Sequence, residues 1–272
     1  MKDDVHPDYA AITERQQATW ATGDFHEISR QIMPISEALC QAADPHAGQR
    51  VLDVACGSGN TAIVAARRYC DVTGIDYVPA LIERAKVRNA AEKLDIDFRV
   101  TDAQALPFPD ASFDTVLSVF GVMFAPDQEK AASELLRVCR PGGTVGLANW
   151  MPEDFGQDFF GAHARHVPPP PGLKPPQRWG TDTGLQELLG AGTRSIESEK
   201  RTNRAYMRSM QHALEEFRSY FGPTSRACQT LDKEAQKSLM NDIETVFRRY
   251  NEATDGTVIL AYQYLQTIAV RK

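Results

Sequence analysis

Residues 53–60 read Asp-Val-Ala-Cys-Gly-Ser-Gly-Asn, a glycine-rich turn between a predicted apolar strand (51–55) and a predicted helix of small residues (60–68). Asn60 is a suitable N-cap for that helix. Glycines in such a turn let a ligand approach the backbone closely, and free amides at the start of the helix point toward it. The turn therefore predicts a site for a dinucleotide, a phosphate or another nucleoside.

The spacing of the glycines separates these ligands. A dinucleotide fingerprint needs three glycines in the pattern G-x-G-x-x-G, and counted from residue 55 the positions hold Ala55, Gly57 and Asn60. A phosphate-binding loop needs Gly-Lys-Ser/Thr, and this turn has no lysine. Asp53 adds a carboxylate beside the turn, which would repel a pyrophosphate but suits a ligand that carries an ammonium group.

Acidic residues also stand at the ends of the next two predicted strands. Asp76 ends the second strand and can accept hydrogen bonds from both hydroxyls of a ribose. Asp102-Ala103 follows the third strand and is placed to hold an adenine, with the carboxylate accepting from the exocyclic amine. Together these loops favour a ligand with an amine, a ribose and an adenine but no phosphate, and S-adenosylmethionine fits that description.

The chain around the turn alternates predicted strands and helices. Such an alternation is typical of a doubly wound α/β fold, a parallel sheet with helices on both faces and strands that are apolar throughout. Ala132, Leu135, Leu136 and Cys139 stand at i, i+3, i+4 and i+7, which predicts a helix. The Pro-Gly-Gly run at 141–143 is predicted to end it. The further predicted strands are 72–76, 96–100, 114–120 and 145–150, with helices over 79–94 and around 132–139.

The remaining segments flank this core. Residues 10–45 are predicted to be helical, with Trp20 and Phe25 among the apolar anchors. The proline-rich stretch 151–181 is predicted to be a stiff loop rather than an element. Later segments predict, in order, a helix over 183–189, an extended stretch near 195–206, two amphipathic helices with stripes from Met210 to Phe221 and from Leu239 to Tyr250, and a closing strand over 258–270.

The motifs, taken in order, resemble those of class I S-adenosylmethionine-dependent methyltransferases. The resemblance rests on residues 53–59, Asp76, Asp102-Ala103 and the Arg-Val-Cys-Arg-Pro-Gly-Gly run at 137–143, and it covers residues 45–150 well. It is nearest to the small-molecule (type 11-like) group that includes the ubiquinone/menaquinone-biosynthesis methyltransferases. Ala55 departs from the family pattern, which has glycine there.

The resemblance implies a seven-stranded, mostly parallel, Rossmann-like sheet whose last strand is antiparallel. It also implies that the first acidic residue and the turn hold the methionine part of S-adenosylmethionine, that Asp76 takes the ribose with Tyr77 flanking the adenine, and that the end of the fourth strand borders the methyl group. The expected cofactor-binding residues are Asp53, Ala55, Gly57, Gly59, Asn60, Asp76, Tyr77, Asp102, Ala103, Ser118 and Phe120.

One structural domain is expected. It comprises an N-terminal helical lid segment (1–45), the S-adenosylmethionine-binding core (46–150) and a part that completes the sheet (151–272), with substrate-cap insertions at about 151–181 and 207–252. Ligands of a doubly wound sheet bind at the carboxyl ends of the strands, and both insertions leave that edge. We therefore expect a lid over an enclosed small-molecule pocket.

The residues that act on the acceptor are less clear from the sequence. A general base is needed only if the attacking atom is weakly acidic. The candidate bases are His163, His166, His26 and Glu153. The candidate substrate-binding residues are Trp20, Phe25, Trp150 and Arg204. Arg204 forms a basic group with Lys200, Arg201 and Arg208 that could bind an anionic substrate. No metal site is expected.

Composition bounds the class of protein. The 272 residues carry a net charge of −6, and 42% of them are hydrophobic, as in an ordinary globular protein. The acidic balance argues against a nucleic-acid substrate. No stretch resembles a membrane span or a signal sequence, so a cytoplasmic monomer or homodimer is expected. The alternatives to a methyltransferase are a non-catalytic S-adenosylmethionine-binding module and, less favoured, an NAD-dependent oxidoreductase.

Overall fold

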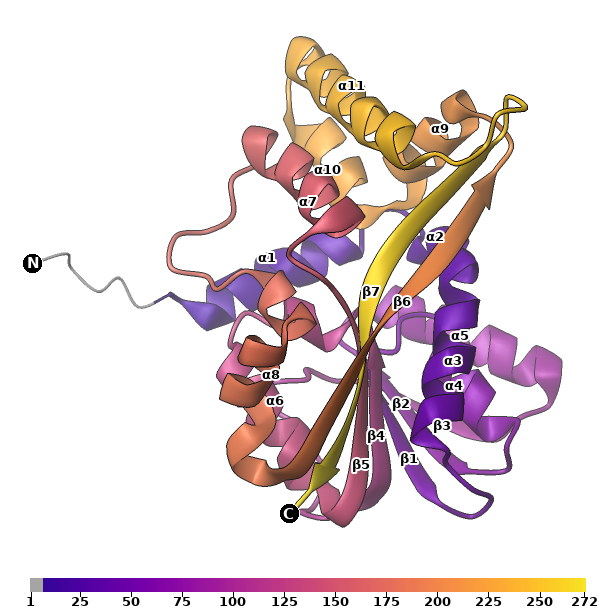
Figure 1. Cartoon of the computed structure of the whole chain (residues 1–272), viewed down its shortest axis with the longest axis vertical. Coiled ribbons are helices and arrows are strands. Elements are labelled where there is room, and N and C mark those ends of the chain that lie inside the picture. Colours follow the sequence, from indigo (N-terminus) through magenta and orange to yellow (C-terminus); the bar gives the residue numbers. More distant parts are fainter. Residues whose placement is uncertain (1–6) are drawn as a thin grey trace, which may run out of the picture.

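The computed structural model describes residues 7–272 and is built around a seven-stranded sheet (Figure 1). The strand order is β3-β2-β1-β4-β5-β7-β6, and all strands are parallel except β7, which is antiparallel to both β5 and β6. The strands are β1 (Arg50–Val54), β2 (Asp71–Asp76), β3 (Ile96–Val100), β4 (Phe113–Val119), β5 (Cys139–Trp150), β6 (Thr193–Met207) and β7 (Val258–Arg271). The predicted fold class is confirmed.

Burial explains why the central strands form where they do. In β1 every residue after Arg50 is buried, including Asp53, because helices cover both faces of the parallel part of the sheet. The register places Asp53 beside Gly74 of β2 and Leu117 of β4. The strand order changes direction between β1 and β4, and the carboxyl ends of strands at such a point form a crevice.

Helices cover the two faces of the sheet in separate groups (Figure 1). The three helices α3, α4 and α5 lie on one face, and α6 and α8 lie on the other. Their bounds are α3 (Met33–Ala43), α4 (Asn60–Ala66), α5 (Pro79–Glu92), α6 (Gln128–Val138) and α8 (Asp182–Leu189), with short 3-10 turns at η2 (Val122–Phe124), η3 (Pro176–Gly180) and η4 (Gly190–Gly192).

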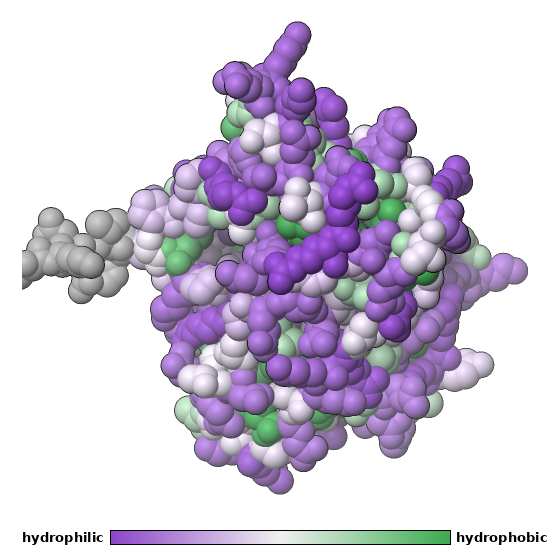
Figure 2. All heavy atoms as spheres, turned by 45° about the horizontal axis from the view of Figure 1, so that its top comes forward, coloured by the Kyte–Doolittle hydropathy of each residue, from purple (hydrophilic) through white to green (hydrophobic). Residues whose placement is uncertain are grey.

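A second group of helices stands over the carboxyl edge of the sheet, and we call it the cap. The long strands β6 and β7 rise out of the sheet into this group (Figure 1). Its elements are α1 (Tyr9–Trp20), α2 (Phe25–Ser29), η1 (Arg30–Ile32), α7 (Asp154–His166), α9 (Met210–Tyr220), α10 (Gly222–Thr230) and α11 (Lys233–Tyr250). Figure 2 shows mostly hydrophilic side chains on the outer face of the cap, and most of its phenylalanines, such as Phe155, Phe159 and Phe217, are buried.

Two of the predicted elements differ from the observed ones. The stretch 151–181 is not a plain loop, because α7 occupies its first half. Phe155, Phe159 and Ala162 give α7 a buried face at helical spacing, and the proline run begins only after the helix has ended. The predicted helix 10–45 is broken at Gly23, whose φ is +84° and whose missing Cβ lets the backbone carbonyl of Tyr220 approach.

Three smaller differences concern helices and a strand end. Gly59, not Asn60, is the N-cap of α4, and Asn60 is the first residue of that helix. The short helix α10 was not predicted and separates the two amphipathic helices. Strand β5 begins at Cys139, so the Pro-Gly-Gly run predicted to end a helix lies inside the strand as defined by its hydrogen bonds. No helix within residues 7–272 is long and apolar enough to cross a membrane.

Candidate active site

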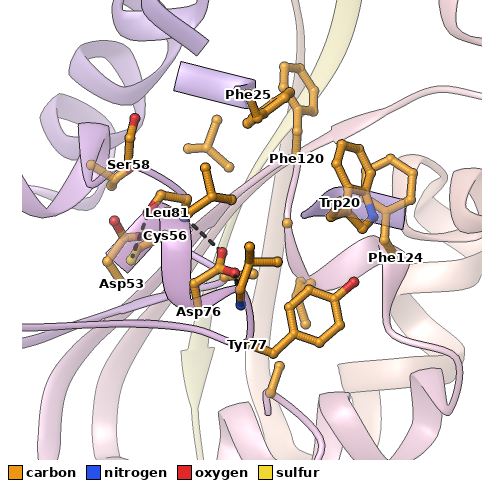
Figure 3. A pocket seen from close by; sticks show the side chains of 18 of the residues that line it. Trp20, Phe25, Asp53, Cys56, Ser58, Asp76, Tyr77, Leu81, Phe120 and Phe124 are labelled. Atoms are coloured by element: carbon orange, nitrogen blue, oxygen red, sulfur yellow. Dashed lines mark hydrogen bonds between the residues drawn. The ribbon is translucent and has the colours of Figure 1, made fainter. Parts of the chain in front are cut away.

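A pocket opens at the carboxyl ends of β1, β2 and β4, where the strand order changes direction. It lies between the sheet edge and the cap. Figure 3 shows Asp53, Cys56 and Asp76 on one wall, with Trp20 and Phe124 facing them across the cavity. We call this space the donor pocket. Of the expected cofactor-binding residues, it is lined by Asp53, Ala55, Gly57, Asn60, Asp76, Tyr77, Asp102, Ala103 and Phe120.

Two buried carboxylates hold the glycine-rich turn in shape. Asp53 accepts a hydrogen bond from the amide of Ala62 in α4 (2.8 Å). Asp76 accepts one from the amide of Gly57 (2.9 Å) and another from that of Val78 (2.9 Å). Each carboxylate therefore joins a strand end to the turn or to the helix that follows it, and each still lines the pocket.

Positive φ angles at two non-glycine residues mark the floor of the donor pocket. Ala55 has φ of +53° and Phe120 has φ of +50°, and these residues follow β1 and β4, the two strands on either side of the crevice. Non-glycine residues in this region carry strain that the surrounding structure must maintain, and such positions gather at functional sites. Position 121 beside them needs a glycine, because a Cβ there would lie only 2.7 Å from Ala55.

The charge in the donor pocket is entirely acidic. Burial, helped by the negative charge of Asp76, raises the pKa of Asp53 to about 8, and burial raises the pKa of Asp76 to about 6. Among the residues that the structure describes, no lysine, arginine or histidine lines this pocket. A buried carboxylate without a cationic neighbour is costly in its ionised form, so the pocket favours a ligand that brings positive charge.

Residues that follow β2 and β3 form the end of the pocket nearest helix α1. The side chain of Asp102 accepts a hydrogen bond from the amide of Gln104 (2.9 Å), which keeps this loop folded beside Tyr77. Helix α1 reaches the same loops, because Gln17 donates to the carbonyl of Tyr77 and the side chain of Gln104 donates to Thr13 (3.0 Å). The cap thus closes this end through hydrogen bonds with both loops.

Two of the expected cofactor-binding residues do not line the pocket. Ser118 is fully buried, and its hydroxyl donates to the carbonyl of Val54 (2.7 Å) and accepts from the amide of Val122 (3.0 Å). Gly59 lies behind the turn, where its missing Cβ makes room for the ring of Phe98. Both residues shape the loops around the donor pocket without lining it, and their assignment to the cofactor stays a prediction.

The position of Gly59 predicts a loss of stability on substitution. Its φ is +85°, and a Cβ would lie 2.8 Å from the ring of Phe98. We expect Gly59→Ala to lower the free energy of unfolding by about 2–4 kcal/mol, from backbone strain and overpacking together. Gly48→Ala is the matched control, since Gly48 has φ of +80° but nothing within 4 Å of its Cβ position. Equal losses in urea unfolding of the two variants would contradict the packing role.

A second cavity continues from the donor pocket into the cap. Most of the side chains that line it are aromatic, and we call it the aromatic cavity. The ring of Phe120 stacks on Trp150 at 4.3 Å between centroids. Trp20, Phe25, Ile32, Phe120 and Phe124 line both spaces, so the two are adjacent. The other aromatic residues of the cavity are Trp150, Phe155, Phe159, Phe160, Phe217, Phe221 and Tyr262.

Three of the four predicted substrate-binding residues lie at this cavity and one does not. Trp20, Phe25 and Trp150 line it. Arg204 is on the surface, where it makes an ion pair with Glu252 (2.7 Å). No member of the anion-binding group expected around Arg204 lines either cavity, so that group stays a prediction without a place at this site.

None of the four predicted base candidates lines either cavity. His163 is buried in the cap, where its Nδ1–H donates to the carbonyl of Phe159 (2.9 Å) and its Nε2 accepts from Thr224 (2.7 Å). Burial lowers the pKa of His163 and keeps the ring neutral. The other three are held by polar partners: His166 by Asp242 (2.9 Å), Glu153 by Lys200 (2.9 Å) and His26 by Ser58 (3.0 Å).

Several lining residues were not singled out from the sequence. Cys56 and Ser58 lie inside the predicted turn, and Phe124 follows β4, the strand that pairs with β1. Phe217 and Phe221 were recognised as an apolar stripe but interpreted as core, and the stripe does pack inward while also lining the aromatic cavity. Glu216 immediately precedes Phe217 of that stripe. A carboxylate next to a buried position of a helix is the signal that points to Glu216 in the sequence.

Comparisons with known proteins agree with this geometry. The family model for a methyltransferase domain matches residues 52–147. An uncharacterized protein of Mycobacterium tuberculosis is 35% identical over 268 residues, which is 96% of each chain. A demethylmenaquinone methyltransferase of Deinococcus radiodurans is 38% identical over 138 residues, 48% of this chain and 56% of that protein. The YcgJ protein of Bacillus subtilis has a similar fold, with a TM-score of 0.60 at 20% identity over 87% of this chain and 98% of the other.

Proposed function

Because the chain belongs to the class I S-adenosylmethionine-dependent methyltransferases, we propose that it transfers a methyl group to a small, apolar or aromatic metabolite enclosed by the cap. The observation that carries this proposal is the adjacency of the two cavities. An acidic pocket at the strand ends and an aromatic cavity in the cap share five lining residues. A ligand in the aromatic cavity therefore lies next to whatever the donor pocket holds.

The residues of the donor pocket fit S-adenosylmethionine. Asp53 is a buried carboxylate without a cationic partner among the described residues, and the ammonium group of the cofactor would compensate it. We assign Asp76 to the ribose, Tyr77 and Asp102-Ala103 to the adenine, and the turn around Ala55 and Gly57 to the methionine part. The free amides at the start of α4 can receive its carboxylate.

The protein's own contribution to the reaction is alignment and exclusion of water. When bound, S-adenosylmethionine supplies an activated methyl group on a sulfonium, which an attacking atom can displace in line. Holding two reactants in the right geometry can contribute up to about 7–11 kcal/mol to catalysis. Phe120 and Trp150, stacked at the junction of the two cavities, are placed to orient an acceptor, and the aromatic walls keep water away.

Two features of the site, the aromatic cavity and Asp53, each weigh against one of the two alternatives. A module that only binds S-adenosylmethionine does not need a second cavity that opens into the first. An NAD-dependent oxidoreductase would have to bring a pyrophosphate past Asp53, which burial and hydrogen bonds fix at the turn. The cytoplasmic location and the monomeric or homodimeric state stay predictions.

The enclosed site leads us to expect label transfer to small molecules. Purified protein would be incubated with S-adenosylmethionine that carries a tritiated methyl group, together with an organic-solvent extract of cells and, separately, with the protein and nucleic-acid fractions. We expect label in the small-molecule fraction alone, because the cap covers the cavity. Label only in the protein or nucleic-acid fraction would contradict an enclosed small-molecule site.

A further inference from the structure

One residue that lines the aromatic cavity carries a carboxylate. Glu216, on α9, is 7% exposed and is the sole aspartate or glutamate among the residues that line this cavity. Its Oε1 accepts a hydrogen bond from Arg30 of η1 at 2.8 Å. The side chain of Arg30 is 51% exposed and does not line the cavity, so the pair turns its negative end inward and its positive end toward solvent.

The sign of charge is the same throughout the two connected cavities. Their linings contain the carboxyl groups of Asp53, Asp76, Asp102 and Glu216 and, within residues 7–272, no lysine, arginine or histidine. The nearest imidazole to Glu216 is that of His212, whose Nε2 lies 3.7 Å from Oε1 and which does not line the cavity. An anionic acceptor would have no counterion in this space.

Aromatic walls and a buried carboxylate together recognise cations. The faces of tryptophan, tyrosine and phenylalanine rings attract ammonium groups, most strongly where water is excluded. A carboxylate that accepts hydrogen bonds from an ammonium adds a charge-assisted contact. The cavity offers both, because aromatic rings make up most of its lining and Glu216 is the carboxylate among the described residues that line it.

We infer that the aromatic cavity takes an amine with an apolar or aromatic body, and that Glu216 is the residue that selects it. The inference rests on the proposed function and names the substrate class for the same site. The rings hold the body of the amine, and Glu216 accepts a hydrogen bond from its nitrogen. Arg30 contacts the Glu216 carboxylate at 2.8 Å while the cavity is empty of ligand and competes with the amine for it.

The test uses three probes that share one aromatic body and differ in charge. Tryptamine is a cation at about pH 7.5, 3-ethylindole is neutral and indole-3-propionate is an anion, as their ordinary pKa values dictate. Each is titrated by calorimetry into the full-length protein saturated with S-adenosylhomocysteine. We expect tryptamine to bind about tenfold or more tightly than 3-ethylindole, and indole-3-propionate to bind weakest.

Two variants separate a selecting role from a structural one. Glu216→Gln should lower the affinity for tryptamine about tenfold and leave that for 3-ethylindole within about twofold. Arg30→Gln frees the carboxylate, so it should raise the affinity for tryptamine. A merely structural ion pair would make both variants change tryptamine binding in the same direction, because each breaks the same contact.

The outcomes divide cleanly. Equal or tighter binding of the anion, an unchanged ratio of tryptamine to 3-ethylindole affinity in Glu216→Gln, or no binding of any probe to the S-adenosylhomocysteine complex would overturn the inference. In each of those cases the proposed function stands as long as S-adenosylhomocysteine itself binds. Failure of S-adenosylhomocysteine to bind would instead remove the proposed function.

Discussion

Replacing Asp76 with alanine should weaken the binding of S-adenosylmethionine by about 1.5–3 kcal/mol, roughly 10- to 150-fold, because hydrogen bonds to a charged group are lost. The structure gives this carboxylate two tasks. It faces the donor pocket, where we assign it to the ribose, and it holds the amides of Gly57 and Val78. The variant therefore loses both the contact with the ligand and the fixed shape of the turn. Calorimetric titration measures the change.

Asp71→Ala is the matched control for this experiment. Asp71 begins the same strand, is exposed and lies at the opposite end from the pocket. Its variant should bind S-adenosylmethionine like the unmodified protein. If Asp76→Ala also binds normally while remaining folded, the ribose assignment is wrong.

The second large effect concerns Asp53 and pH. Burial raises the pKa of this carboxyl to about 8, so in the ligand-free protein it is mostly protonated at neutral pH. An ammonium group placed beside it favours the ionised form, so binding should release a proton from Asp53. Affinity should therefore rise between about pH 6 and 8, by at most about tenfold per pH unit. Titration in buffers of different ionisation enthalpy counts the released protons.

The same shift makes Asp53 a cost to folding. The pKa of the carboxyl is raised in the folded chain above its ordinary value of 3.8, so its contribution to stability is full below about pH 4 and is lost as pH rises toward about 8. We expect Asp53→Asn to be more stable than the unmodified protein at pH 8, by roughly 1–3 kcal/mol, while it binds S-adenosylmethionine poorly. A variant that loses stability at pH 8 and still releases a proton on binding would contradict this account.

The sequence predicted those parts of the site that depend on local patterns. The turn at residues 53–60 and the acidic ends of the next strands gave all three acidic residues that line the donor pocket among the residues that the structure describes. The parallel core followed from the alternation of strands and helices, and the family resemblance added the seven strands and the antiparallel last strand. These features can be read locally because each depends on the end of one strand and the loop after it.

Features that depend on contacts between distant segments were not predictable in the same way. The role of Gly59 depends on the ring of Phe98, which is 39 positions further along (98 − 59), and the hydroxyl of Ser118 is taken by the carbonyl of Val54. The histidine candidates looked available in sequence, but His163 is bound by Thr224 from another helix of the cap. Only the assembled cap shows which side of each of its helices faces the cavity.

The proline-rich region shows how composition misled the prediction. The prolines at 168–171 and 175–176 favoured one stiff loop across the whole of residues 151–181. These prolines all lie beyond His166, where α7 ends. Phe155, Phe159 and Phe160 lie within α7 and line the aromatic cavity. A short helix whose apolar face meets other helices needs tertiary packing for most of its stability, and local propensity does not show it.

The measurement that tests the central claim most directly is calorimetric titration of verifiably ligand-free protein with S-adenosylmethionine and S-adenosylhomocysteine, with NAD as the control ligand. The account predicts micromolar binding of the first two and no binding of NAD, because the donor pocket is acidic and its glycine spacing does not suit a pyrophosphate. Binding of NAD instead, or of none of the three, would contradict it.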